Sequence, residues 1–389
     1  MLVAIDAVGI RGHGAAAVLS ELLTWLPRVR THWRWHTFLF ERSLREFAAP
    51  EVAPQVLLEQ TDQGNRGWDR LRWVRRQLPE RIQSLRPDVV LCMANIGNPR
   101  PRRPQVVFCH QPNAFFTEGT SFWTMRRWRQ RFMRSQIVRG ALSSKAIIVQ
   151  TDGMRRRMAE IEPRLDGRIH VIPSGYRTPT DHPVVCARKK RFIDSCTRPR
   201  LAYVSHPSEH KNHAVLLRAL PRIARSFPDV RLLLTLERDD PPSARYARFV
   251  RELRQLARRL GMERHVAFLG VLTPDEVNYL LSTSDLMVFP SLAESFGLGI
   301  AESMAAGCPV AASDLPYAHD VADEAAVYFD PRDPDSIAQT VVSCLLDPQM
   351  IVRLKSSGAK RRHRFSYERI AGSIAQVIEA AAGAQQPPL

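Results

Sequence analysis

Two carboxylates lie in a stretch of small and apolar residues, Phe289–Asp314, that reads FPSLAESFGLGIAESMAAGCPVAASD. Glu294 follows a predicted strand in a short loop, and Glu302 lies about a turn into a helix expected from Gly299 to about Ala306. A loop that leads into a helix N-terminus offers free N–H groups and a positive dipole end, which suit a pyrophosphate. Carboxylates instead suit the paired hydroxyls of a sugar or a ribose. The stretch therefore predicts a site for a nucleotide diphosphate that carries a sugar.

The same stretch resembles the retaining GT-B glycosyltransferases, especially family four, which carry two Glu separated by seven residues at this place. The resemblance implies that Glu294 binds hydroxyls of the transferred sugar and that Glu302 binds the ribose hydroxyls. In the family, the residues after the first Glu supply backbone N–H groups to the sugar and the phosphates. In this chain those donor-binding residues are Ser295, Phe296, Gly297 and Leu298.

A second candidate binding segment is Val204–Asn212, VSHPSEHKN, which follows the first predicted strand of the second half of the chain. The family has a Gly-Arg pair and a later Lys in this segment, and both cations reach the diphosphate. The resemblance implies that Lys211 takes the place of that Lys. In this chain Ser205 and His206 occupy the place of the Gly-Arg pair. His206 is expected to help hold the donor, although a histidine carries only part of a positive charge near neutral pH.

The first half of the chain contributes a glycine-rich turn and a histidine. Gly12 and Gly14 follow the first predicted strand, where the family has a Gly-rich turn that approaches the donor phosphates and the acceptor. His110 follows another predicted strand and occupies the place of a histidine near the transferred sugar in similar enzymes. The resemblance therefore implies that His110, Lys211 and Glu294 are the catalytic residues.

No metal site and no cofactor is expected. Asp330, Asp333 and Asp335 fall in a proline-broken loop, DPRDPD, which is typical of a turn rather than of a metal motif. Glycosyltransferases of GT-B fold need no bound divalent ion, so the resemblance implies that Lys211 and the helix N-terminus neutralise the leaving diphosphate. The nucleotide sugar enters as the donor substrate.

Segment 121–139, SFWTMRRWRQRFMRSQIVR, predicts a helix that carries both aromatic and basic residues. At helical spacing, Trp128 and Phe132 fall on one arc, and Arg131 and Arg134 fall on the other. Aromatic side chains beside an Arg-rich face are typical of a helix that lies on an anionic membrane surface. A helix packed on its own core with a basic outer face is the alternative, and both interpretations stay open.

Short apolar runs alternate with longer helical patterns along the chain, which indicates parallel sheets built from βαβ units. The runs that we predict to be strands are Leu2–Ile5, Val89–Cys92, Val106–Cys109, Ala146–Val149, Ile169–Ile172, Leu201–Val204, Val230–Leu234, Val266–Leu269, Leu286–Phe289, Val310–Ala312 and Ala326–Phe329. Because one sheet of that many strands would be unusually wide, two sheets are expected. We therefore expect an α/β protein of GT-B fold, with two Rossmann-like domains and a cleft between them. The acceptor domain would span 1–180 and the nucleotide-sugar domain 181–365, with a final helix in 366–389 that crosses back to the first domain and ends in a short tail.

The composition fits an anionic partner. The chain of 389 residues has 56 Lys and Arg against 39 Asp and Glu, a formal net charge of +17. Such an excess favours phosphorylated ligands or lipid headgroups, while no module typical of nucleic-acid binding is present. Six scattered cysteines have neither disulfide nor zinc spacing, and no apolar run is long enough to span a membrane. We expect a cytoplasmic protein that attaches, if at all, peripherally to the cytosolic face of the inner membrane.

Together these features predict a retaining, metal-independent hexosyltransferase. The donor would be GDP-mannose or a UDP-hexose. The acceptor would be a saccharide or a lipid-linked saccharide in cell-envelope, lipopolysaccharide or exopolysaccharide synthesis. Two alternatives stay open, namely a nucleotide-sugar 2-epimerase of the same GT-B architecture and a non-catalytic protein that binds sugar nucleotides or lipid. A NAD-dependent dehydrogenase is disfavoured because no GxGxxG follows the first strand.

Overall fold

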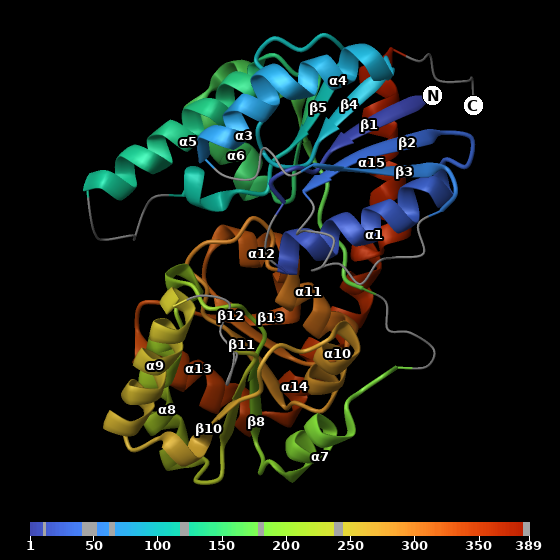
Figure 1. Ribbon diagram of the computed structural model, residues 1–389. Coiled ribbons are helices and arrows are strands. Elements are labelled where there is room, and N and C mark those ends of the chain that lie inside the picture. The colour runs from blue at the N-terminus through green and yellow to red at the C-terminus, as the bar shows by residue number, and fades with distance from the viewer. Residues whose placement is uncertain are drawn as a thin grey trace. The chain divides into compact units, whose positions relative to one another are not determined.

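The computed structural model describes residues 1–10, 13–40, 53–61, 67–116, 124–177, 183–236 and 244–383 (Figure 1). The chain forms two compact units, of which the first combines Met1–Gly175 with Ser366–Leu389 and the second is Tyr176–Phe365. Each unit has a parallel sheet with helices on both of its faces. Within the described ranges, no helix is both long enough and apolar enough to span a bilayer.

The described strands of the first unit form a seven-stranded parallel sheet in the order β3-β2-β1-β4-β5-β6-β7. They are β1 (Leu2–Asp6), β2 (Arg34–Phe40), β3 (Val56–Thr61), β4 (Val89–Cys92), β5 (Gln105–Phe108), β6 (Ala146–Val149) and β7 (Ile169–Val171). Ala4 of β1 lies opposite His36 of β2 on one side and Val90 of β4 on the other. The strand order therefore reverses between β1 and β4, which makes this the switch point of the first sheet.

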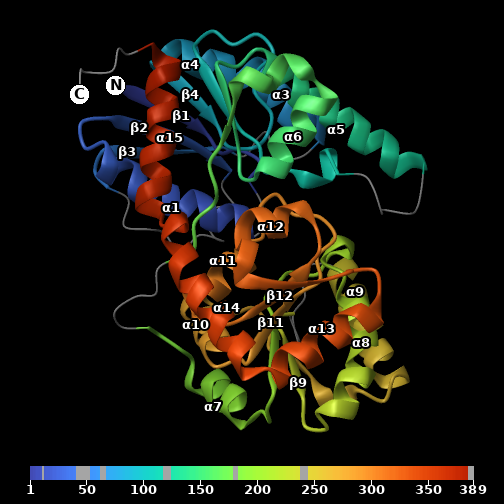
Figure 2. The ribbon, with the colours of Figure 1, turned by 180° about the vertical axis from the view of Figure 1, so that it is seen from behind.

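Two groups of helices cover this sheet. On one face, α1 (His13–Val29) packs against α15 (Tyr367–Ala382), as both views show (Figures 1 and 2). The helices on the other face are α3 (Gly67–Arg72), α4 (Leu78–Leu85), α5 (Thr124–Leu142) and α6 (Asp152–Ile161), with a π-helical turn (Trp73–Gln77) between α3 and α4. Trp73, Ile137 and Met158 from these helices share one buried cluster with Val90 and Val107 of the strands.

The described strands of the second unit form a six-stranded parallel sheet in the order β10-β9-β8-β11-β12-β13. They are β8 (Arg200–Tyr203), β9 (Arg231–Leu234), β10 (Val266–Phe268), β11 (Leu286–Phe289), β12 (Val310–Ser313) and β13 (Ala326–Phe329). Leu201 of β8 lies opposite Leu232 of β9 and Leu286 of β11. The switch point of the second sheet is therefore between β8 and β11.

The helices of the second unit again form two groups. They are α7 (Ala187–Ser195), α8 (His213–Ser226), α9 (Ala244–Arg259), α10 (Pro274–Ser282), α11 (Leu298–Ala305), α12 (Pro316–Ala322), α13 (Pro334–Leu346) and α14 (Pro348–Arg361). Helices α8, α9 and α13 lie together, and α10, α11, α12 and α14 form the other group (Figure 2). Local sequence signals explain their bounds: Thr273 and Glu276 form a capping box at the start of α10, and Gly307, with φ 72°, follows the end of α11.

The predicted α/β architecture of two Rossmann-like domains is confirmed, and each predicted strand is present to within one residue at either end. Two strands were not predicted, β2 and β3. In β2 the polar residues His36 and Thr37 are buried within the strand, so β2 lacks the continuous apolar run that predicts the other strands. In the edge strand β3 the half-exposed pattern includes Glu59. Neither strand therefore reads as a continuous apolar run.

Candidate active site

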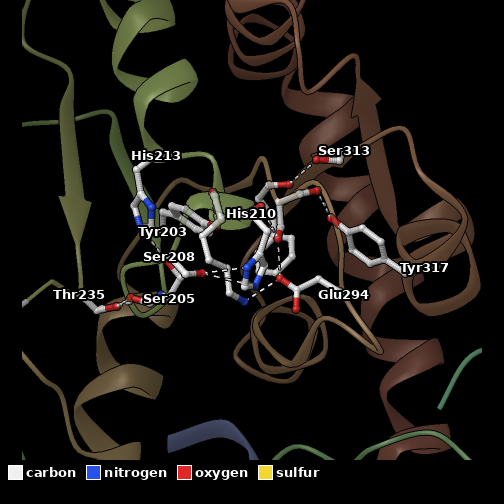
Figure 3. Close-up of polar contacts among 12 residues, drawn as sticks. Tyr203, Ser205, Ser208, His210, His213, Thr235, Glu294, Ser313 and Tyr317 are labelled. Atoms are coloured by element: carbon white, nitrogen blue, oxygen red, sulfur yellow. Dashed lines mark hydrogen bonds and ion pairs between the residues drawn. The ribbon is translucent and has the colours of Figure 1, made fainter. Parts of the chain in front are cut away.

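The carboxyl ends of β8 and β11 are neighbours at the switch point of the second sheet, where doubly wound folds bind their ligands. The segment after β8 carries Lys211, and the loop after β11 carries Glu294. The two segments contact each other, because Leu292 N–H donates to the carbonyl of His210 at 2.7 Å and Ser291 Oγ lies 3.2 Å from the same carbonyl oxygen. The structure therefore brings the two separately predicted segments into one site (Figure 3).

At its centre is an ion pair. Lys211 Nζ lies 2.6 Å from Glu294 Oε1, and Ser291 Oγ donates a hydrogen bond of 2.6 Å to the same oxygen. Lys211 is only 9% exposed, and its ammonium lies 5.6 Å from the centre of the Phe289 ring. The pair is therefore largely shielded from water and held in one geometry.

The backbone that carries Lys211 is anchored on three sides. Lys211 ends a 3₁₀ turn, and the next residue, Asn212, has φ 58°. Asn212 Nδ2 donates to the carbonyl of Pro290 at 3.1 Å and to that of Pro331 at 2.6 Å. The Tyr203 hydroxyl donates to the carbonyl of Lys211 at 2.7 Å. The ammonium is thus positioned by the ends of β8, β11 and β13.

Glu294 is ionised at neutral pH. Burial opposes ionisation, but the charge of Lys211, together with His210 and the Ser291 hydroxyl, outweighs it, so the pKa of Glu294 lies below its ordinary value. Lys211 and Ser291 both hold Oε1. Glu294 is therefore a preorganised hydrogen-bond acceptor.

Glycines shape the loop that joins β11 to α11. Gly297 has φ 96°, in the region that favours glycine, and α11 begins at the next residue. A Cβ on Gly299 would come within 2.9 Å of Met287 Cε and 3.1 Å of the Phe289 ring, so a larger residue would have to displace these side chains for the helix to stay this close to the strand. Phe296 is buried, with its ring 5.4 Å from that of Phe365. The first N–H groups of any helix have no partner within it, so the start of α11 provides donors suited to an anion.

Glu302 is half-buried on α11. Among the residues that the structure describes, none donates a hydrogen bond to its carboxylate. Burial raises the pKa of Glu302 to about 7, against the opposing charges of Lys211 and Arg177. The carboxylate of Glu302 can therefore accept hydrogen bonds from a ligand.

Three histidines gather on the segment between β8 and the first turn of α8. Ser208 Oγ lies 3.0 Å from His210 Nδ1, and the rings of His206 and His210 meet edge to face with centres 6.3 Å apart. Ser205 Oγ lies 2.8 Å from Nε2 of the buried His213. Burial lowers the pKa of His213 to about 3, with nearby positive charge adding to the effect. His213 is therefore a neutral structural residue, whereas His206 is exposed.

In the first unit, His110 follows β5. The backbone N–H of His110 donates to Asn95 Oδ1 at 2.7 Å, and Asn95 Nδ2 lies 3.4 Å from His110 Nε2 of the imidazole ring. Burial lowers the pKa of His110 to about 4, so the imidazole is neutral near pH 7. Gly14 lies exposed in the first turn of α1, and Gly12 lies outside the described residues.

A buried ion pair at the end of β1 was not predicted. Both Nη atoms of Arg70 donate to the carboxylate of Asp6, at 3.0 and 2.7 Å, and Trp73 Nε1 donates to it at 3.0 Å. A Cβ on Gly9, which has φ 102°, would lie 3.2 Å from Arg70 Cδ. The pair therefore fixes the path of the chain as it leaves β1. The available signal was Asp6 itself, a charged residue that ends an apolar strand.

The acids of the DPRDPD loop have local structural partners. Asp333 Oδ1 accepts from Asp335 N–H at 2.9 Å at the start of α13, and Asp330 Oδ1 accepts from Arg332 N–H at 2.8 Å. Within the described ranges, no three His, Cys, Asp or Glu side chains gather in a way that could hold a metal ion.

Known proteins resemble this chain both in sequence and in structure. A phosphatidyl-myo-inositol mannosyltransferase of Mycolicibacterium smegmatis is 33% identical over 177 residues, which is 45% of this chain and 43% of that protein. The chain thus aligns with less than half of that relative's length. The crystal structure of Anabaena HepE in complex with UDP and glucose has a TM-score of 0.72 at 19% identity, with 98% of this chain and 100% of that chain covered. WaaG, a glycosyltransferase involved in lipopolysaccharide biosynthesis, has a TM-score of 0.70 at 17% identity, with 97% and 99% covered.

At these identities the two structures show a shared fold, which is GT-B. Two family models match the sequence itself. The model described as Glycosyltransferase Family 4 matches residues 13–178, and the model described as Glycosyl transferases group 1 matches residues 198–347. Between them they span most of both units. The chain belongs to the group 1 glycosyltransferases of family four.

Proposed function

We propose that this chain is a retaining hexosyltransferase that uses a nucleotide-diphosphate sugar. The observation that carries the proposal is the buried Lys211–Glu294 pair, with Glu302 on the adjoining helix, at the switch point of the second sheet. Lys211 supplies a positive charge for the diphosphate, Glu294 accepts hydrogen bonds from the sugar, and Glu302 accepts them from the ribose. His206 assists Lys211, and residues 295–298 donate backbone N–H groups.

The proposed reaction proceeds on one face of the sugar. The bond between the anomeric carbon and the diphosphate oxygen breaks, the acceptor oxygen bonds to that carbon on the same face, and the departing phosphate oxygen takes the acceptor's proton. The chain then acts by positioning and by charge stabilisation. Lys211 and the start of α11 stabilise the charge that develops on the diphosphate. His110, neutral near pH 7, contributes a hydrogen bond near the transferred sugar rather than a charge.

The names of the relatives support the choice of substrates. One acts as a mannosyltransferase on a phosphatidylinositol, one binds UDP and glucose, and one takes part in lipopolysaccharide biosynthesis. We therefore propose GDP-mannose or a UDP-hexose as donor. The proposed acceptor is a saccharide or a lipid-linked saccharide of the cell envelope, and we propose that the reaction takes place in the cytoplasm.

The test is a panel of nucleotide sugars, screened first by thermal shift and then for turnover with saccharide acceptors. A ligand at about a hundred times its Kd stabilises a native protein by about 2.7 kcal/mol, which is readily visible as a rise in melting temperature. Acceptor-dependent release of the nucleoside diphosphate is expected for one donor. Interconversion of the donor sugar without an acceptor would instead support a 2-epimerase. Binding without turnover would support a non-catalytic protein.

We also propose that transfer needs no divalent ion, because Lys211 and the start of α11 neutralise the diphosphate. Activity should therefore survive EDTA at a concentration that removes all free Mg²⁺ and Mn²⁺. Loss of activity in EDTA, with recovery on addition of either ion, would contradict this part of the proposal.

A further inference from the structure

Among its described residues, the first unit exposes three large aromatic side chains. Trp68 is 76% exposed on α3, and Trp128 and Phe132 are 71% and 43% exposed on α5. Trp128 and Phe132 lie one helical turn apart, while Ile137 and Ala141 of the same helix are buried in the core. The aromatic residues of the described part of α5 therefore point outward, and the core-packed alternative does not apply to them.

Two helices build this surface together. The rings of Trp68 and Phe132 lie 5.6 Å apart, and Arg75 Nη2 donates to Gln136 Oε1 at 2.6 Å. Helices α3 and α5 are close neighbours in both ribbon views (Figures 1 and 2). Residues 67–77 and α5 therefore present one continuous surface.

The same surface is strongly basic. Arg72 and Arg76 are exposed on the segment that carries Trp68, and Arg131 is exposed beside Phe132. Residues 67–77 and 124–142 contain a single acidic residue, Asp69. We call the set of Trp68, Trp128, Phe132, Arg72, Arg76 and Arg131 the aromatic–basic face. Aromatic and basic residues are mixed on this face, which differs from the two separate arcs that the sequence predicted for α5.

We propose that the aromatic–basic face docks the protein on an anionic lipid bilayer, with the rings in the interfacial region and the guanidinium groups on the lipid phosphates. Trp is favoured at membrane interfaces, and clustered Arg residues are attracted to anionic leaflets. Large apolar side chains that are exposed side by side, rather than scattered singly, are typical of interaction sites. A second copy of the chain is a poorer occupant, because self-association would bring the Arg residues of the two faces together. The inference stands apart from the proposed reaction, since docking needs no donor.

The test is co-sedimentation of the full chain with vesicles of phosphatidylglycerol and phosphatidylcholine, compared with vesicles of phosphatidylcholine alone. Replacing Arg72, Arg76 and Arg131 by Gln should lower the partition coefficient on the anionic vesicles by about a hundredfold, since each cation contributes about fivefold. Trp68→Ala with Trp128→Ala should lower it at least tenfold on both kinds of vesicle. Acyl chains carrying bromine should quench the wild-type fluorescence and should quench a Trp68→Phe, Trp128→Phe variant much less.

Two matched controls come from the second unit. Arg248, Arg251 and Arg258 are exposed on α9, so replacing them by Gln removes the same charge elsewhere. Leu346 and Val352 are 65% and 67% exposed, so their replacement by Ala removes exposed apolar surface elsewhere. Both controls should bind vesicles as the wild type does, and melting curves should confirm that every variant is folded. Wild-type binding by the face variants, or equal losses in the controls, would overturn the proposal. So would a dimer in solution that the Trp68→Ala, Trp128→Ala variant abolishes.

Discussion

Removing Lys211 should destabilise the second unit because it leaves a buried carboxylate without its counter-ion. Lys211 Nζ is 2.6 Å from Glu294 Oε1, and after a Lys211→Ala substitution only the Ser291 hydroxyl still holds that oxygen. Breaking a buried pair in this way costs about 3 kcal/mol. For a unit of this size, Tyr176–Phe365, that corresponds to a fall in melting temperature of about 6–12 °C. The double variant Lys211→Ala, Glu294→Ala should be more stable than Lys211→Ala alone by about 1 kcal/mol or more, because the unpaired charge is gone.

The cost should depend on pH, with a sign fixed by the pKa of Glu294. That pKa is held below its ordinary value, mainly by Lys211 acting against burial, so the pair stabilises the fold above the pKa of an unfolded Glu. This contribution is lost as the pH falls through the lower, folded value. In Lys211→Ala, the charge of Lys211 no longer counteracts the effect of burial, so the pKa of Glu294 rises. Protonation of Glu294 then removes the unpaired buried charge. The stability difference between wild type and variant should therefore shrink as the pH falls from about 8 to about 5.

A second ion pair, between a partly exposed lysine and a buried carboxylate, provides the control. Lys189 Nζ lies 2.7 Å from Glu276 Oε2, away from the switch point, and Glu276 is buried. Lys189→Ala should destabilise the protein by less, because Lys189 is partly exposed and the N–H groups of Thr273 and Cys186 still donate to Glu276, and it should leave nucleotide affinity unchanged. Lys211→Ala should also lose at least about tenfold in diphosphate affinity. Urea unfolding and calorimetric titration at several pH values measure both effects. A cost below about 1 kcal/mol for Lys211→Ala, or a cost that grows as the pH falls, would show that Lys211 does not stabilise a buried, ionised Glu294.

Three further outcomes follow from the site. Glu302→Gln should weaken nucleotide binding about ten- to a hundredfold at pH 8 and less at pH 6, because the wild-type pKa is about 7 and the acceptor is protonated below it; a pH-independent difference in titrations would contradict the ribose role. His206→Arg should strengthen diphosphate binding about tenfold at pH 8, because a guanidinium is always charged and presents a fork of donors that matches phosphate; unchanged affinity would exclude His206 from the diphosphate. His110→Ala should lower kcat about ten- to a hundredfold without altering the pH–rate profile above about pH 5.5, since the pKa of His110 is about 4; loss of a limb near neutral pH in the variant would show that the histidine acts as an acid or base.

The sequence predicted the elements better than the contacts. Apolar runs such as Leu286–Phe289 identify buried parallel strands directly, because both faces of such a strand are covered. Strand β2 was missed because His36 and Thr37 are buried by tertiary packing, which no local pattern records. The sequence pattern predicted helix α5 but not which of its sides faces outward. Whether Trp128 is exposed depends on where α3 and the sheet lie.

Of the candidate site, the positions of Lys211 and Glu294 were predictable and their pairing was not. Both follow strands, but only the strand order shows that β8 and β11 are neighbours. The residues that hold the pair in place, Ser291 and Asn212, are short polar side chains in loops. Such residues are common in turns, so their role becomes visible only from their hydrogen-bond partners.

The most direct test of the central claim is a proton NMR time course of the full chain with its donor and a saccharide acceptor. We expect a new anomeric signal with the donor's anomeric configuration, which appears together with free nucleoside diphosphate and is absent from Glu302→Ala at the same donor concentration. A product of the opposite configuration would contradict retention. Donor that changes its sugar without an acceptor, or no release of nucleoside diphosphate from any donor in the panel, would contradict glycosyl transfer itself.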